Sequence, residues 1–146
     1  MRRLLLLAAL ALLALPATAG AHPLGNFSVN HLTEVRVSPD RVDVLYVLDE
    51  AEIPTFQERG LPASEVLARK RAEVARGVRV TVGGRPVALA PAGPARLTHP
   101  PGQGGLPLTR LELPLSARVR TLGATVTVHD GTFGDRIGWH AVVPLP

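Results

Sequence analysis

Alternation of apolar and polar residues over two consecutive stretches is the feature that most constrains this fold. From 27 to 37 the odd positions are mostly apolar and the even ones mostly polar, and 41–48 repeats the pattern. Successive side chains of a β-strand point to opposite faces, so this period indicates strands with one buried and one wet face. Ser38-Pro39-Asp40 between them is a turn sequence. We therefore predict an antiparallel hairpin.

One helix is predicted after this hairpin. Residues 63–76 are rich in Ala, Leu, Glu, Lys and Arg, and Pro62 before them suits a first helical turn. Gly77 is typical of the position just past a helix end. The acidic segment 49–60, interrupted by Pro54, is interpreted as a connection that contains a strand extension or a short turn.

Short strands with polar turns are predicted for the rest of the chain. Gly83-Gly84 separates residues 78–82 from residues 85–90. Glycine tolerates the positive φ of a two-residue turn, so these segments have the signature of a tight hairpin. The other candidate short strands are residues 95–98, 125–130 and 139–143.

Residues 106–115 form a further candidate strand, whose leucine pattern changes phase near Thr109. The change predicts a bulge, or an edge strand because Pro107 and Pro114 cannot donate a backbone hydrogen bond. The whole pattern is mainly β. It predicts an antiparallel two-layer β-sandwich, immunoglobulin-like, with one helix inserted after the first hairpin.

Residues 1–21 have the pattern of a cleaved export signal. Arg2 and Arg3 precede an apolar core at 4–15, which is too short to span a bilayer comfortably and is broken by Pro16. An uncleaved membrane anchor is the alternative interpretation. No later apolar run approaches the length of roughly 18 residues that a membrane span needs. The sequence therefore predicts an exported, extracytoplasmic protein.

The predicted cleavage site decides the new amino terminus. Small residues at Ala19 and Ala21 suit a signal peptidase cut after Ala21, and residues 17–19 offer a second acceptable site. The first cut leaves residues 22–146, which is the length of one ordinary domain. It also leaves a free α-amine on His22.

Composition excludes several functions. The chain has no cysteine, which excludes disulfides, thiol catalysis and cysteine ligation of a metal. The net charge of +4 includes the two leader arginines, so the mature part is too balanced to favour nucleic-acid binding. With three Phe, one Trp and one Tyr, an aromatic platform for nucleic acid or carbohydrate is not expected.

Histidines are the candidate metal ligands of this chain. An amino-terminal His22 can close a chelate through its amine and its ring, and neutral nitrogen donors suit Ni(II), Co(II), Cu(II) or Zn(II). Pro23 lacks the amide N–H that some amino-terminal copper and nickel sites deprotonate, which leaves the amine–imidazole pair. One residue cannot hold a metal ion firmly, so further ligands are needed.

Two other histidines are candidate partners. His31 lies at the inward parity of the first strand, where it is either a ligand or a hydrogen-bonded buried histidine. His129 lies on a wetter parity beside Asp130, which could orient its ring, and a solvated histidine is the alternative. His99 and His140 are interpreted as surface or strand-end residues. The predicted metal ligands are His22, His31 and His129.

No catalytic motif supports an enzyme. The G-x-S-x-G and H-E-x-x-H patterns are absent, and GQGG at 102–105 lacks the Lys-Ser/Thr of a phosphate-binding loop. Asp49, Glu50 and Glu52 could act as acids and bases or bind hard cations, but an acidic solvated loop is the preferred interpretation. An oxidative copper enzyme built on the amino-terminal histidine is a remote alternative. We predict that the chain is not an enzyme.

Four motifs in order resemble one group of bacterial exported sequences. They are AHPLGNFSVNH, VLDEAEIPTFQE, PPGQGGLP and DRIGW, within a match from about Ala21 to Val143. The chain is similar to the extracytoplasmic N-terminal domain that precedes a polytopic permease in the nickel/cobalt transporter family. Relatives often carry an acidic, calcium-loop-like insertion before the helix. This chain has the short ERGLPASE there, so calcium binding is not carried over.

The resemblance implies divalent-metal handling at the outer face of the cytoplasmic membrane, with His22 meeting the metal first. The membrane-spanning permease part lies outside this sequence, which leaves open a truncated transporter or a separate soluble partner. The leading prediction is therefore a domain that binds or presents Ni(II) or Co(II) for a membrane permease. The alternative is a non-metal, structural or protein-interaction sandwich that packs on a permease or another exported protein.

Overall fold

The computed structural model describes residues 25–146, so the predicted export signal and His22 lie outside the described residues. The larger sheet contains β1 (Val29–Ser38), β2 (Arg41–Glu50), β5 (Ala90–Pro91), β6 (Arg96–Thr98), β7 (Thr109–Arg118) and β9 (His140–Leu145). The smaller sheet contains β3 (Val78–Val82), β4 (Arg85–Val87) and β8 (Val126–Asp130). The helical elements are the α-helices α2 (Glu52–Gln57) and α3 (Ala63–Gly77) and the short 3₁₀ turns η1 (Gly25–Phe27) and η2 (Gln103–Gly105).

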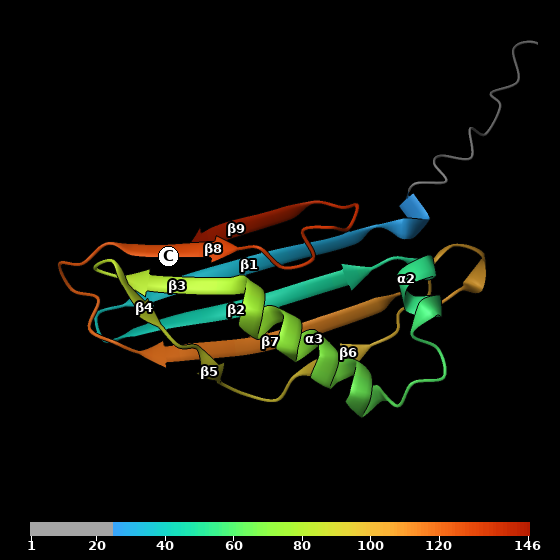
Figure 1. The fold of residues 1–146 in the computed structure, drawn as a ribbon, viewed down its shortest axis with the longest axis horizontal. Coiled ribbons are helices and arrows are strands. Elements are labelled where there is room, and N and C mark those ends of the chain that lie inside the picture. The colour runs from blue at the N-terminus through green and yellow to red at the C-terminus, as the bar shows by residue number, and fades with distance from the viewer. Residues whose placement is uncertain (1–24) are drawn as a thin grey trace, which may run out of the picture.

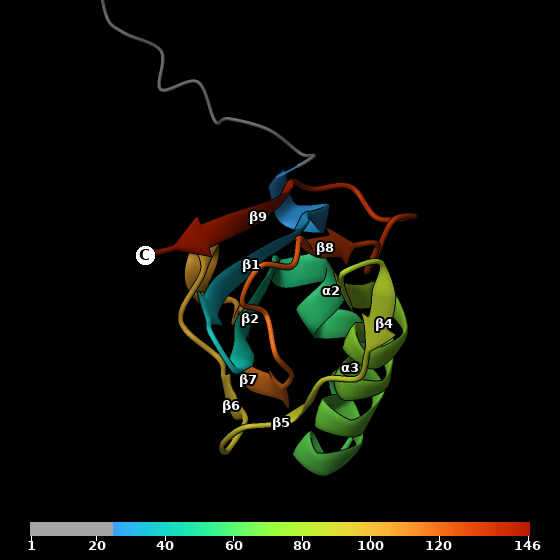
Figure 2. The same cartoon turned by 90° about the vertical axis from the view of Figure 1, so that its left-hand side faces the viewer.

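The two sheets form the layers of the molecule. The larger sheet has the order β5-β7-β2-β1-β9 with β6 also beside β7, and the smaller sheet has the order β4-β3-β8. Viewed end-on, β1, β2 and β7 lie on one side and α3 and β4 on the other (Figure 2). The predicted mainly β fold with a helix after the first hairpin is confirmed, and its immunoglobulin-like character stays a prediction. No helix within residues 25–146 is both long and apolar enough to cross a membrane.

The first hairpin forms as its alternation predicts. β1 and β2 pair in register from Val29 with Glu50 to Ser38 with Arg41, which leaves a two-residue turn at Pro39 and Asp40. Alternate residues of β1 are buried from Val29 to Val35. The Gly83-Gly84 turn also forms as predicted, with positive φ at both glycines and β3 paired to β4.

The last strand departs from an all-antiparallel sheet. β9 lies parallel to β1, with His31 opposite His140, whereas the other strand pairs in this part of the chain are antiparallel. The segment after β8 crosses from the smaller sheet to the edge of the larger one, as the orange-to-red ribbon of Figure 1 shows. A crossover between sheets brings β9 to β1 in the same direction, which a hairpin cannot do.

The phase change in residues 106–115 marks the start of a strand. β7 begins at Thr109 and alternates regularly from there, so the predicted bulge is wrong. β7 is also not an edge strand, because β2 lies on one side of it and β5 and β6 lie on the other. Pro114 is tolerated because it lies between the β6 and β5 pairings, where its carbonyl still accepts a hydrogen bond from the Ala92 N–H.

The acidic segment 49–60, which begins with the last two residues of β2, is more ordered and more buried than predicted. It contains α2, and Glu50 and Glu52 are buried, so a solvated loop is the wrong interpretation for these two carboxylates. The Lys70 ammonium of α3, also buried, lies 2.6 Å from Glu50 Oε2 and 2.9 Å from Glu58 Oε1. Burial raises the pKa of Glu50, and Lys70 partly opposes that increase.

The apolar core fills the space between the two layers. Tyr46, Leu48, Leu111 and Leu113 of the larger sheet have almost no exposed surface, and Val74 of α3 faces them. The valines of β3 close the core from the other layer. Burial of such side chains contributes about 1.5–3 kcal/mol each, which stabilises a chain that has no disulfide.

Gly77 allows the end of α3 to approach the segment after β8. It does not follow the helix as predicted but is its last residue, and its carbonyl accepts a hydrogen bond from the Gly131 N–H. A Cβ at this position would lie only 2.8 Å from the backbone nitrogen of Thr132. The close approach, and not a positive φ, requires glycine here.

We expect Gly77→Ala to lower the free energy of unfolding by about 1–3 kcal/mol, because overpacking must displace the Thr132 backbone. Urea unfolding followed by circular dichroism measures the change. Gly134→Ala is the matched control, since the nearest atom to a Cβ there is 3.8 Å away. Equal stability of the two variants would contradict this account.

Candidate functional site

A buried carboxylate and imidazole join the two sheets. His31 of β1 and Asp130, the last residue of β8, lie with His31 Nδ1 at 2.9 Å from Asp130 Oδ2. The Thr33 hydroxyl, two residues along β1, donates to the same oxygen at 2.7 Å. His31 is 4% exposed and the Asp130 side chain is fully buried. The predicted inward parity of His31 is confirmed.

The second carboxylate oxygen of Asp130, Oδ1, accepts hydrogen bonds from Thr132, two residues further along the chain. Thr132 donates its backbone N–H to Oδ1 at 3.0 Å and its hydroxyl to Oδ1 at 2.7 Å. With its own proton used in this way, the Thr132 hydroxyl accepts from the Tyr46 hydroxyl at 2.7 Å. Four donated hydrogen bonds therefore satisfy the carboxylate, and Tyr46 of β2 extends the network across the larger sheet.

The network sets the charge states of its members. Burial alone would raise the pKa of Asp130, but hydrogen bonds from His31, Thr33 and Thr132 outweigh it and hold that pKa well below its usual range. Burial also raises the pKa of Tyr46, so its hydroxyl stays protonated. An ionised Asp130 accepts only, so His31 donates from Nδ1, and in its neutral form the lone pair lies on Nε2.

His140 is the residue beside this network that sequence reasoning missed as part of a site. It is exposed, lies opposite His31 in the parallel register, and its ring stacks on that of His31 at 5.3 Å between centroids and 11° between planes. Phe133 and Tyr46 flank the other sides of the His31 ring. No local pattern signals the pairing, because the two histidines are 109 positions apart along the chain.

His129 does not join His31. It is exposed on the opposite face of β8 from Asp130, which agrees with the wetter parity predicted for it. The neighbouring carboxylate therefore orients His31 and leaves His129 unsupported. His99 is exposed too, with its Nδ1 3.2 Å from the Leu108 carbonyl oxygen. Among residues 25–146 no three histidine or carboxylate side chains gather closely enough to hold a metal ion.

Comparison of the chain with known protein families, with curated proteins and with solved structures finds no match.

The chemistry of the site follows from the hydrogen bonds. A carboxylate that binds one imidazole nitrogen fixes the tautomer and makes the other nitrogen a better ligand, as in many metal sites. In the described part of the chain His31 Nε2 makes no hydrogen bond, so this nitrogen is the one available for a ligand. The hydroxyl protons of Thr33 and Thr132 are both used on Asp130.

We expect Asp130→Asn to lower the free energy of unfolding by about 1–3 kcal/mol at pH 7, because the amide cannot accept from all four donors and leaves buried donors unpaired. The pKa of Asp130 is lower in the folded protein than in the unfolded chain, where it is about 3.9. Ionised Asp130 therefore stabilises the fold at pH values above about 5, and this stabilisation is lost as the pH falls through the native pKa. The variant should therefore lose less of its stability than the wild type between pH 5 and pH 3.

Urea unfolding at each pH measures this difference. Asp43→Asn is the matched control, because Asp43 pairs with Arg41 at the surface and should cost no more than about 1 kcal/mol. The pKa of Glu50 is raised, so its contribution to the pH dependence of stability has the opposite sign to that of Asp130. Glu50 is present in the wild type and in both variants, so this contribution cancels when their pH curves are compared. Parallel pH curves for the wild type and Asp130→Asn would show that Asp130 does not carry the acid sensitivity.

Proposed function

We propose that this protein is the extracytoplasmic domain, or a separate exported partner, of a nickel/cobalt-type membrane permease, and that it binds Ni(II) or Co(II) as cargo. The observation that carries the proposal is the orientation of His31. Asp130 holds its Nδ1, which leaves Nε2 available in a ring that stacks on the exposed ring of His140. The resemblance of the four sequence motifs to that transporter family supports the same function.

The two proposed ligands within the described residues, His31 and His140, are aligned near the start of β1. The His31 N–H donates to the Trp139 carbonyl and the Val29 N–H to the Ile137 carbonyl, so the segment before β9 borders the start of β1. His22 precedes Gly25, the first described residue, by three positions. An amine and ring from His22, with His31 and His140, would give up to four nitrogen donors. His129 has no part in this set.

Metal binding requires His140 to turn. Metal–nitrogen bonds are about 2 Å long, so two nitrogens on one ion lie no more than about 4 Å apart. The rings of His31 and His140 are stacked and nearly parallel, with 5.3 Å between centroids and 11° between planes, so their in-plane lone pairs do not converge on one ion. His140 is exposed at the surface, whereas His31 is buried and held by Asp130. His31 is the fixed ligand of the proposal and His140 the mobile one.

We expect isothermal titration of the cleaved protein that begins at His22 to show binding of one Ni(II) or Co(II). His140→Ala should weaken the affinity about tenfold or more, as loss of a supporting metal contact does. One extra residue before His22 should weaken it as well, because the amine moves away from the ring. His129→Ala is the matched control and should leave the affinity unchanged.

Affinity that is no better than that of an unfolded peptide with the same histidines would overturn the metal proposal. His31 is left unsubstituted in this series because it also holds the two sheets together. Cu(II) and Zn(II) serve as competitors that test which ion the site prefers.

A second candidate function rests on the edge of the larger sheet. Among residues 25–146 β9 is the last strand of that sheet, so its outer backbone groups have no strand partner in the described part of the chain. Exposed apolar side chains lie on it and just before it, namely Ile137, Trp139, Val142 and Val143. An unpaired edge with apolar side chains suits a non-metal interaction module that packs on a permease or another exported protein. Failure of all metal binding would favour this candidate.

A further inference from the structure

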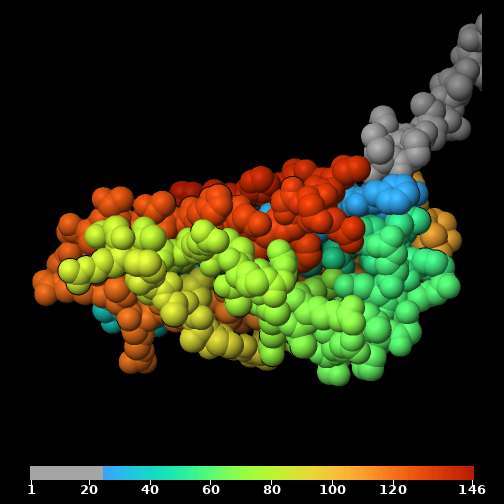
Figure 3. Space-filling view, viewed as in Figure 1, coloured from blue at the N-terminus to red at the C-terminus, as the bar shows by residue number. Residues whose placement is uncertain are grey.

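A largely apolar cavity of about 420 Å³ lies between the two layers, beneath α3. Its volume is within the range of small-molecule binding sites, which is about 300–1,000 Å³. Figure 3 shows the covering face, where green α3 adjoins the yellow-green β3–β4 hairpin. Eleven of the fourteen lining residues are valine, leucine, alanine or proline, and the other three are Arg71, Arg79 and Thr81.

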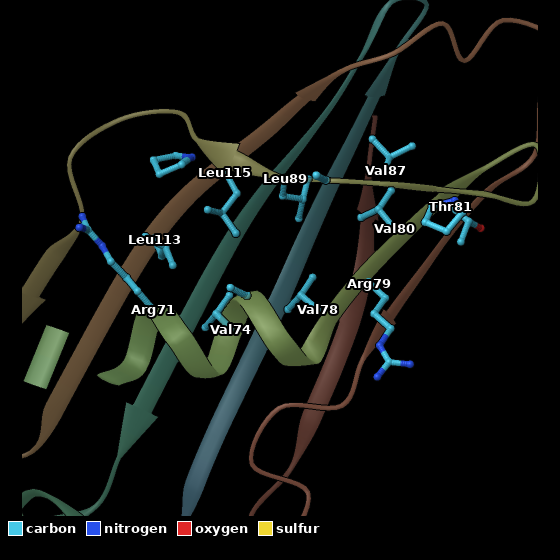
Figure 4. Close-up of a pocket in the computed structure, with 14 residues that line it drawn as sticks. Arg71, Val74, Val78, Arg79, Val80, Thr81, Val87, Leu89, Leu113 and Leu115 are labelled. Carbon is cyan, nitrogen blue, oxygen red and sulfur yellow. The ribbon is translucent and has the colours of Figure 1, made fainter. Parts of the chain in front are cut away.

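Irregular pairing at one edge of the molecule leaves this space open. β4 has three residues and β5 has two, and the chain between them leaves the smaller sheet to join the larger one. Pro86 and Pro91 limit backbone pairing along this crossing segment. The cavity is therefore lined from both layers without a continuous ladder of strands between the sheets: Figure 4 shows Leu89 toward Leu115 of β7 and Val87 toward Val80 of β3.

Arg71 gives the cavity a cation at one end. It lies one helical turn before Ala75, which also lines the cavity. Figure 4 shows Arg71 extending past Leu113 along the side of the cavity, whereas Arg79 turns away from the apolar side chains. Within the described residues Arg71 makes no ion pair, although Arg69 and Arg76 on the same helix each pair with a glutamate. None of the described residues that line the cavity is acidic.

We propose that this cavity binds a single-chain aliphatic carboxylate, with its alkyl chain among the valines and leucines and its carboxylate at Arg71. Apolar walls exclude a strongly polar ligand, since buried polar groups without partners are costly. The unpaired guanidinium selects an anionic head group over a neutral or cationic one. This site is separate from His31 and His140 and does not depend on a metal ion.

The test uses dodecanoate as the probe, titrated into the full mature protein below its micellar concentration and in the presence of EDTA. Calorimetry should show one site, and dodecyltrimethylammonium, which has the same chain and the opposite charge, should bind more weakly. In methyl NMR spectra the dodecanoate should shift Leu89, Leu113 and Val80. Shifts confined to other leucines, such as Leu97 and Leu106, would overturn the assignment.

Two pairs of variants test separately how the ligand's alkyl chain and its carboxylate contribute to binding. Ala75→Phe should fill the cavity and abolish binding, whereas Ala72→Phe, an exposed position of α3 that does not line the cavity, should not. Arg71→Gln should weaken dodecanoate about twofold to fivefold, the range for an exposed ion pair, without weakening dodecanol. Arg120→Gln, away from the cavity, should have no effect.

Three results would overturn the proposal: no dodecanoate binding by the wild type, equal binding by Ala75→Phe, or binding only to anionic phospholipid vesicles. Should Ala75→Phe fail to fold, the NMR map of the wild type still decides the location. The metal titration does not enter this test, so either proposal can fail without the other.

Discussion

The position of one sheet on the other depends on a single buried carboxylate. Asp130 ends β8 in the smaller sheet and accepts hydrogen bonds from His31 and Thr33 of β1 in the larger sheet. Hydrophobic contact between layers is not directional, whereas hydrogen bonds to a charged group restrict both distance and angle. Desolvation of the carboxylate is costly, and its four donors offset that cost. The buried imidazole and the geometry around it follow from this arrangement.

Local patterns predicted the local parts of the fold. The alternation on both sides of Pro39 and Asp40 and the two glycines at 83 and 84 act through near neighbours, so the two hairpins were correct. The features that the sequence did not predict depend on contacts between residues far apart in the chain. Nothing near Thr109 distinguishes a bulge from the start of a strand, and the pairing of His31 with Asp130 joins residues 99 positions apart. The sequence thus predicted that His31 faces inward but not what it meets there.

Lys70 shows how a charged residue can belong to a core. Lys70 lies on the buried face of α3 with Val66 and Val74, and the acidic segment 49–60 was interpreted as solvated. In the structure the two observations explain each other, because the buried ammonium meets Glu50 and Glu58. A buried charge needs a partner of opposite sign. An apolar helix face that includes a lysine is therefore a signal for a buried acid elsewhere in the chain.

The parallel pairing of β1 with β9 has a consequence for the order of folding. β1 can form its hairpin with β2 as soon as residue 50 is available, yet its other edge stays open until residues 140–145 arrive. Closing a loop of this length costs entropy before any contact compensates it, which slows chains with many distant contacts. Between these two events the unpaired edge of β1 is a site where a nascent chain can aggregate or meet a chaperone.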